Sequence, residues 1–333
     1  MAALGVGGFG IWAKSASNAR LTKTFVAHTV DFPVPFPLSD AEIEALRAEK
    51  TAVSAAMTPP ASPGAPPVDP LAGVDLAAIA LERARESGKH LVLGRYACSE
   101  CHGKDFSGGK MIDDPMFGVI QGPNLTGGAG SHVAGWTVAD WDRQVRHGIR
   151  KDGTAAIMPS KDYLSMSDHE LSDILAYLQS FPAVDTAEAE RRLGPVGTVL
   201  VAMGALELSA EIHPDHDHVH AVEAPPTAVT VEFGAHLAKA CSGCHREAFD
   251  GGPIPGGAPS WPPAANLTNG PDGLAGWTYA DFLRAMREAT SKDGRKLASP
   301  MAEMTGLASQ MTDVELEAMW AYLSTVPGRP DGT

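Results

Sequence analysis

The sequence is short of cysteine and of basic residues. Its 333 residues include four cysteines, all in two C-x-x-C segments, so none is left for a disulfide, a cysteine nucleophile or a lipidated N-terminus. Lys and Arg number 26 against 40 Asp and Glu, which gives a formal net charge of −14. This charge argues against nucleic acid as a partner and against docking on an anionic membrane surface. It favours a partner with a basic patch, although a solvated acidic surface is the simpler alternative.

The N-terminus lacks a long apolar run. Residues 2–13 (AALGVGGFGIWA) are apolar but end at Lys14, whereas crossing a bilayer of about 30 Å takes roughly 20 residues. The stretch also lacks the basic start of a signal peptide. Residues 1–30 are expected to be an anchor or docking segment. They are the tail of an anchor helix that begins upstream, a short anchor continuing through Ser17, or a helix packed on a partner subunit.

Two five-residue motifs carry the chemistry of the chain. The segment CSECH at 98–102 recurs as CSGCH at 241–245, and C-x-x-C-H is the attachment motif of c-type haem. Two thiols on one turn can each add to a vinyl group of the same porphyrin, and the next residue offers an imidazole nitrogen to iron. A structural zinc would need four ligands, and a thioredoxin-type motif would need a βαβ pattern. We therefore predict two covalent haem c groups, held by Cys98, Cys101 and His102, and by Cys241, Cys244 and His245.

The motifs belong to two copies of a longer pattern, about 143 positions apart. In both copies the motif is followed by N-L-T, by G-W-T-x-A-D and by a capped helix that ends in A-Y-L. The repeat predicts two helical domains, at residues 75–183 and 229–333. A Pro-rich extended arm at 31–74 precedes them, with a semi-rigid linker at 58–70 and a short helix over 40–50. A linker at 184–228 separates them.

The repeat also suggests the sixth iron ligand. Met158 and Met301 each lie 56 residues after the motif histidine and beside a proline. A thioether ligand favours Fe(II) and raises the potential of a haem. Filling a core gap is the alternative for any methionine. The rival ligands are Met166 in the first unit and Met304 and Met311 in the second.

Other residues have two readings each. Trp136 and Trp277, at matched positions, donate to a haem propionate or pack in the core. Asn124 and Asn266 bind a propionate or shape a turn. The tract 213–220 (HPDHDHVH) holds four His and two Asp. It can bind a divalent metal, although such tracts are usually solvated loops.

On these motifs the sequence resembles the class I cytochrome c superfamily, specifically dihaem membrane-anchored cytochromes c, over residues 76–182 and 230–327. The resemblance implies an all-α fold of two tandem domains with partly exposed haem edges. It departs from the family pattern in the Pro300-Met301 order, the short N-terminus and the Pro-rich segment. The similar cytochrome subunits of membrane-bound alcohol dehydrogenases carry three such domains, whereas this chain has two.

The function expected on this basis is electron transfer without substrate chemistry. The chain would relay electrons between a redox protein donor and acceptor in a respiratory or photosynthetic chain. It would do so as a subunit of a membrane complex, on the periplasmic side of the cytoplasmic membrane. Two alternatives stay open. A dihaem cytochrome c peroxidase would need an iron position open to peroxide, which two matched methionines argue against. A largely structural haem subunit is the other.

Overall fold

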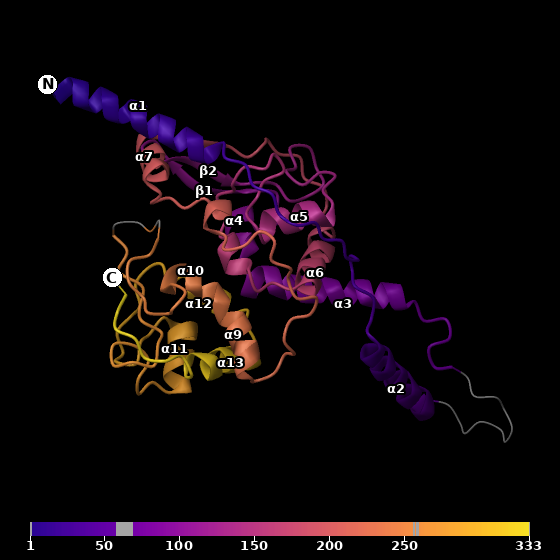
Figure 1. The fold of residues 1–333 in the computed structure, drawn as a ribbon. Helices are drawn as coiled ribbons and strands as arrows, with labels where there is room; N and C mark the ends of the chain where they lie inside the picture. The colour runs from indigo at the N-terminus through magenta and orange to yellow at the C-terminus, as the bar shows by residue number, and fades with distance from the viewer. Residues whose placement is uncertain (1, 58–68, 256, 258–259, 333) are drawn as a thin grey trace, which may run out of the picture.

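The computed structural model describes residues 2–57, 69–255, 257 and 260–332. The Pro-rich linker expected at 58–70 therefore lies almost wholly outside the described residues. Two mainly helical units lie side by side, and helices α1 (Ala2–Leu21) and α2 (Asp40–Met57) project from them (Figure 1). Among the described helices, none combines the length and the apolar character needed to span a bilayer.

A crossing pair of helices forms the centre of each unit. In the first, α3 (Leu76–His90) crosses α6 (Asp168–Leu178); in the second, α9 (Val231–Ala238) crosses α13 (Asp313–Leu323). A glycine stands at each crossing. A Cβ on Gly88 would lie 2.0 Å from the carbonyl oxygen of Asp173, and one on Gly234 would lie 1.9 Å from that of Ala318. Both distances are far below van der Waals contact, so the helices approach this closely only because these residues lack a side chain.

Capping boxes start the helices that follow the motifs. Helix α5 (Val138–Val145) begins after Thr137, α6 after Ser167, α11 (Tyr279–Glu288) after Thr278 and α13 after Thr312. In each case the cap hydroxyl accepts from the backbone of the third helical residue, whose carboxylate accepts in return from the cap amide. The capped helix that ends in A-Y-L is therefore confirmed in both copies, and each G-W-T-x-A-D segment supplies a further box, because this signal is local to four residues.

The first unit adds a small sheet to the all-α pattern expected from the resemblance. Strands β1 (Gly109–Asp114), β2 (Gly118–Gly122) and β3 (Arg191–Leu193) are antiparallel in the order β1-β2-β3. The turn into β2 passes through Gly118, whose φ of 126° is open to glycine alone. β3 comes from the segment expected to be a linker.

That segment, residues 184–228, packs on the first unit. Besides β3 it contains α7 (Pro195–Met203), which lies against α1, and the short helix α8 (Ser209–Ile212). The arm at 31–74 likewise departs from a fully extended form, since α2 continues to Met57 where a short helix over 40–50 was expected. The remaining elements are π-helical η1 (Leu91–Arg95), α4 (Cys98–His102), 3₁₀ turns η2 (Ser160–Tyr163) and η3 (Lys239–Cys241), α10 (Ser242–His245) and α12 (Met304–Ala308).

The two units meet through a reciprocal set of polar contacts. His90 of the first unit lies 2.8 Å from Glu315 of the second, and His236 of the second lies 2.9 Å from Glu170 of the first. Arg95 pairs with both carboxylates. We call these five residues the interface cluster. Its two Glu side chains also close the capping boxes of α6 and α13, so the contact is rigidly tied to both helix crossings.

Candidate functional site

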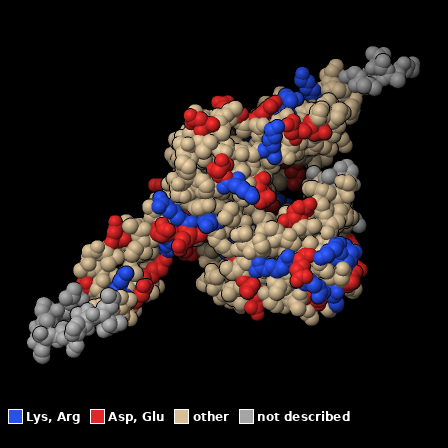
Figure 2. Space-filling view, turned by 180° about the vertical axis from the view of Figure 1, so that it is seen from behind, with Lys and Arg blue, Asp and Glu red and all other residues tan. Residues whose placement is uncertain are grey.

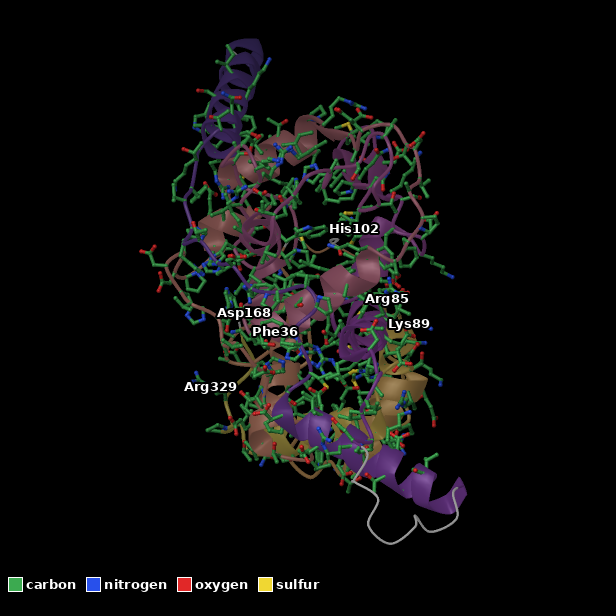
Figure 3. All side chains as sticks on the ribbon, turned by 90° about the vertical axis from the view of Figure 1, so that its right-hand side faces the viewer. Phe36, Arg85, Lys89, His102, Asp168 and Arg329 are labelled. Carbon is green, nitrogen blue, oxygen red and sulfur yellow. The ribbon has the colours of Figure 1, made fainter. Side chains whose placement is uncertain are left out.

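A cavity of about 370 Å³ opens beside the first motif, within the range of ligand sites in proteins. Helix α4 places Cys98, Cys101 and His102 on its wall, and the loops around α5 add Trp136 and Met158. Figure 3 marks His102 inside the first unit. The cavity thus brings together five of the six residues predicted from the sequence for the first haem.

Both motif histidines are held in one tautomer. The Nδ1–H of His102 donates to the carbonyl of Pro123 at 2.9 Å, and that of His245 donates to Ala265 at 2.7 Å. Since a carbonyl can only accept, the proton sits on Nδ1 and Nε2 is left with a lone pair. Burial lowers the pKa of both imidazoles, so each is neutral at pH 7. A neutral, oriented imidazole with a free Nε2 suits an axial iron ligand.

The motif cysteines are available for covalent attachment. None of the four, all of which the structure describes, forms a disulfide. Burial raises the pKa of Cys98 and of Cys241 to about 12, so these side chains are neutral thiols. Each pair lies on or beside one short helical turn that ends at the motif histidine. The donor set, the spacing and the cavity in the first unit fit a covalently attached haem.

Two aromatic residues that the sequence analysis missed shape the turn after each motif. Phe106 and Phe249 are buried and both have a φ of 57°, a left-handed conformation unusual for a bulky residue. Their carbonyls accept from the amides of Leu125 at 2.8 Å and Leu267 at 2.7 Å. These bonds join each motif to the N-L-T loop. The available signal was a phenylalanine four residues after the histidine in both copies.

The N-L-T asparagines hold that loop in place. Oδ1 of Asn124 accepts from the amide of Thr126 at 2.8 Å, while its Nδ2 donates to the carbonyl of Val184 at 2.7 Å. In the second unit Nδ2 of Asn266 donates to Arg329 at 2.9 Å, in the C-terminal segment that Figure 3 labels. Both amides are used within the protein. This arrangement favours the loop-shaping interpretation over a propionate contact.

The tryptophans occupy different surroundings. Trp136 lies on the cavity wall, with its ring 5.2 Å from that of Trp141. Trp277 packs against the apolar core of the second unit. The position on the cavity keeps the propionate hypothesis open for Trp136, while the packing of Trp277 matches the core alternative.

Met158 faces the cavity on a loop fixed by the segment that follows the first unit. Its amide donates to Oγ of Ser209 at 3.1 Å, and this hydroxyl also contacts the Met158 carbonyl. Ser209, at the start of α8, was missed because it lies 51 positions away, in the segment expected to be a linker. Met158 is therefore placed by a contact that only the folded chain reveals.

The rival methionines differ from Met158 in their surroundings. Met166 also borders the cavity but is 1% exposed within the core cluster, and its carbonyl accepts from Arg146 at 3.1 Å. Met311 packs on the second core. Met304 begins α12 and is 37% exposed, while Met301 is half-buried in the preceding turn. Met158 shares the cavity wall with His102 and is less buried than Met166, which favours Met158 in the first unit, while the choice of Met301 in the second unit stays a prediction from the repeat.

Comparisons with known proteins match each of the two units to a cytochrome family. Residues 231–327 match the family described as Cytochrome c, and residues 84–178 match Cytochrome C oxidase, cbb3-type, subunit III. The chain is 26% identical over 257 residues to a fructose dehydrogenase cytochrome subunit of Gluconobacter japonicus, covering 70% of this chain and 51% of the relative. It is 27% identical over 259 residues to the cytochrome c subunit of an alcohol dehydrogenase (quinone) of Gluconacetobacter polyoxogenes, covering 70% and 54%.

A shorter relative matches over most of its length. A protein of Cereibacter sphaeroides named "Diheme cytochrome c-type" is 25% identical over 255 residues, covering 69% of this chain and 82% of the relative. The chain thus spans about half the length of the two dehydrogenase subunits and most of the dihaem protein.

Proposed function

We propose that this protein, a member of the class I cytochrome c superfamily with two tandem domains, carries electrons through two covalently bound haem c groups. The observation that supports this most directly is the duplicated C-x-x-C-H turn. In each copy the histidine donates from Nδ1 to a backbone carbonyl and keeps Nε2 for iron. A structural zinc would need the two C-x-x-C pairs to come together as four ligands, whereas here each pair lies in its own unit.

Each residue of the sites has a defined task. When bound, haem c supplies a one-electron couple between Fe(III) and Fe(II). Cys98 and Cys101 would tether the first haem, while His102 Nε2 and the Met158 sulfur would ligate its iron. In the second unit Cys241, Cys244, His245 and Met301 would do the same. The contacts of Ser209 with the Met158 backbone would support the loop that carries this ligand.

The partners follow from the relatives. Two of the three reported are named as cytochrome subunits of dehydrogenases, so we propose a dehydrogenase subunit as electron donor and a second redox protein as acceptor. The assembly would be a membrane complex on the periplasmic side of the cytoplasmic membrane. On the face in Figure 2 acidic and basic side chains are interspersed. Docking on this face of the described residues therefore need not depend on one acidic patch.

Haem content tests the proposal. Purified protein should keep all its haem through acid–acetone extraction, and its mass should exceed that of the polypeptide by two haems. A double variant, Cys98→Ala with Cys101→Ala, should lose one of the two covalent haems, while Ser99→Ala should lose none. Haem that extracts from the wild type would contradict covalent attachment.

Carbon monoxide separates an electron carrier from a peroxidase. If Met158 and Met301 ligate both irons, the reduced wild type should bind carbon monoxide slowly at neutral pH, and peroxide turnover should stay at the level of free haem. Met158→Ala should open one position and bind carbon monoxide rapidly, which provides the positive control. Rapid binding by the wild type, together with peroxide-dependent oxidation of a donor, would favour the enzyme.

A further inference from the structure

Five histidines that lie far apart in the sequence gather on one side of the first unit. His28 comes from the segment between α1 and the Pro-rich arm, His147 follows α5, and His213, His216 and His220 come from the segment after α8. We call these five residues the histidine cluster. His147 is fully buried, while His213 and His220 are 8% and 4% exposed. Two histidines of the tract at 213–220 are therefore buried against the domain while most of its other residues are exposed, where the composition alone favoured a solvated loop.

Three rings of the cluster use one nitrogen on the backbone and leave the other bare. His28 Nδ1 donates to the His216 carbonyl at 3.3 Å, His216 Nε2 to Ala210 at 2.9 Å and His220 Nδ1 to Leu164 at 3.2 Å. The remaining nitrogens, Nε2 of His28, Nδ1 of His216 and Nε2 of His220, have no hydrogen-bond partner among the described residues. A backbone bond on one nitrogen and a lone pair on the other is the arrangement typical of metal-binding histidines.

His147 stands at the centre of the cluster. Its ring centroid lies 4.6 Å from that of His213, 5.7 Å from that of His216 and 5.0 Å from that of His28. Neither of its ring nitrogens has a hydrogen-bond partner in the described part of the chain. Burial lowers the pKa of this imidazole to about 3, so it is neutral. Leaving polar atoms unpaired in the interior is unfavourable, and an ion bound at the lone-pair nitrogen would remove one of the two unpaired atoms.

We propose that His147, His213 and His216 bind one divalent transition-metal ion of the zinc or copper class. One nitrogen from each can be chosen so that all three lie within 4.8 Å of one another. Imidazole ligands suit zinc and copper, whereas magnesium and calcium prefer oxygen. A second group of three, His28, Asp142 and His147, lies within the same distance and shares His147 with the first.

Two neighbouring interactions bear on this site. Nδ1 of His213 accepts from the Asp215 amide at 3.2 Å, so binding through Nε2 moves the ring proton to Nδ1 and breaks that one bond. The nearest cation, Arg146, is already paired with Asp142 at 2.7 Å and with Asp168 at 2.8 Å. Its charge is therefore largely balanced, and the cluster can accept a divalent ion.

The proposed metal site lies beside the segment that supports the Met158 loop. The ion would join the end of α5 to the segment that carries Ser209, and Ser209 holds the Met158 loop. Metal binding would thus strengthen the support of the predicted Met158–iron bond without touching the haem. This consequence depends on the proposed function, whereas metal binding itself does not.

Zinc titration of the haem-loaded full-length protein tests the proposal. After removal of metals with EDTA, calorimetry with zinc alone should give one ion per chain, and elemental analysis should find it retained through gel filtration. His216→Ala should weaken zinc binding at least tenfold. His218→Ala is the matched control, because His218 is exposed in the same tract and belongs to neither group of three; its affinity should equal that of the wild type.

The readout is independent of electron transfer. An unchanged Soret spectrum and metal-free melting midpoint would show that His216→Ala is folded. Should that variant fail to fold, wild type loaded with Cu(II) should show at least three nitrogen ligands by electron paramagnetic resonance. No retained zinc, fewer than three nitrogen ligands, or equal weakening in both variants would overturn the proposal. Failure of haem attachment with intact zinc binding would instead count against the proposed function alone.

Discussion

Replacing Arg95 by methionine should destabilise the contact between the two units by a large amount. Arg95 is 9% exposed, and its guanidinium lies between Glu170, at 8% exposure, and Glu315, at 2%. Nη2 of Arg95 is 2.7 Å from Oε1 of Glu315, and Nη1 contacts Glu170. Methionine has a similar length but no charge. Arg95→Met therefore leaves two buried carboxylates near each other, with the capping-box contacts and the two histidines, His90 and His236, but no arginine to pair with.

The pKa values of the two glutamates indicate how much stability Arg95→Met should lose. Burial alone would raise the pKa of Glu170, but the hydrogen bond from His236 and the charges of His236 and Arg95 outweigh it and hold that pKa at about 2. For Glu315, burial is likewise outweighed by hydrogen bonds from His90 and Arg95, and its pKa is also about 2. A carboxyl shifted from 4.5 to about 2 gains roughly 3 kcal/mol at neutral pH. Since the two histidines would still provide part of this stabilisation, we expect Arg95→Met to lower the free energy of unfolding by about 3–5 kcal/mol.

Guanidinium denaturation of the haem-loaded protein at pH 7 and pH 4 measures the effect. Both glutamates contribute stability above their ordinary pKa and lose it as the pH falls from 4.5 toward 2, so the cost of Arg95→Met should shrink at pH 4. Arg284→Met is the matched control. Arg284 is 36% exposed and pairs with Asp281 at 2.9 Å on a helix surface, so its loss should cost under about 1 kcal/mol. A cost below about 1 kcal/mol for Arg95→Met, or the same cost at both pH values, would refute this account.

Three further outcomes are expected. Gly234→Ala should destabilise the second unit by at least about 2 kcal/mol in thermal unfolding, because its Cβ would overlap a carbonyl of α13; Gly306→Ala, with nothing within 4 Å of the added atom, should be neutral or stabilising. Met158→His should lower the potential of one haem in a redox titration and halve the Met–iron charge-transfer band; an unchanged band would reassign the ligand. An acid titration of the wild type should lose stability between pH 4.5 and 2, and Glu170→Gln should flatten that loss, whereas an equal slope in both proteins would place the effect elsewhere.

The sequence predicts the parts of this structure that depend on neighbouring residues. The motif turns and the capping boxes each involve residues within four positions, so their spacing carries the signal. Contacts between residues far apart in the sequence leave no such signal in the spacing. Arg95 meets its glutamates across 75 and 220 positions, and Ser209 reaches Met158 across 51. The sequence predicts a linker at 184–228 because the contacts of this stretch with the first unit are of this distant kind.

The histidine cluster is a second case in which contacts between distant parts of the sequence could not be predicted. The tract at 213–220 was recognised by composition, but its burial and the approach of His147 depend on how the chain folds back on α5. One distant signal was available and was not used. Gly88 and His90 recur as Gly234 and His236 at the same spacing, and a glycine kept inside a helix usually has a packing reason.

The reciprocal contact between the units has the form of a homodimer interface joined into one chain, since each unit offers a histidine and a glutamate to the other. The arginine breaks this symmetry. Eight positions separate His90 from Cys98, but only five separate His236 from Cys241, and Arg95 lies in the longer stretch. Two first units facing each other would bring two arginines to a space filled by one, and two second units would bring none for their two glutamates. A pair of first units would balance two glutamates with two arginines but would have to place both guanidiniums where one fits, so the mixed pair alone avoids both faults. If the two domains were expressed as separate polypeptides, the single arginine of the mixed pair would favour association of the two different domains over association of either domain with itself.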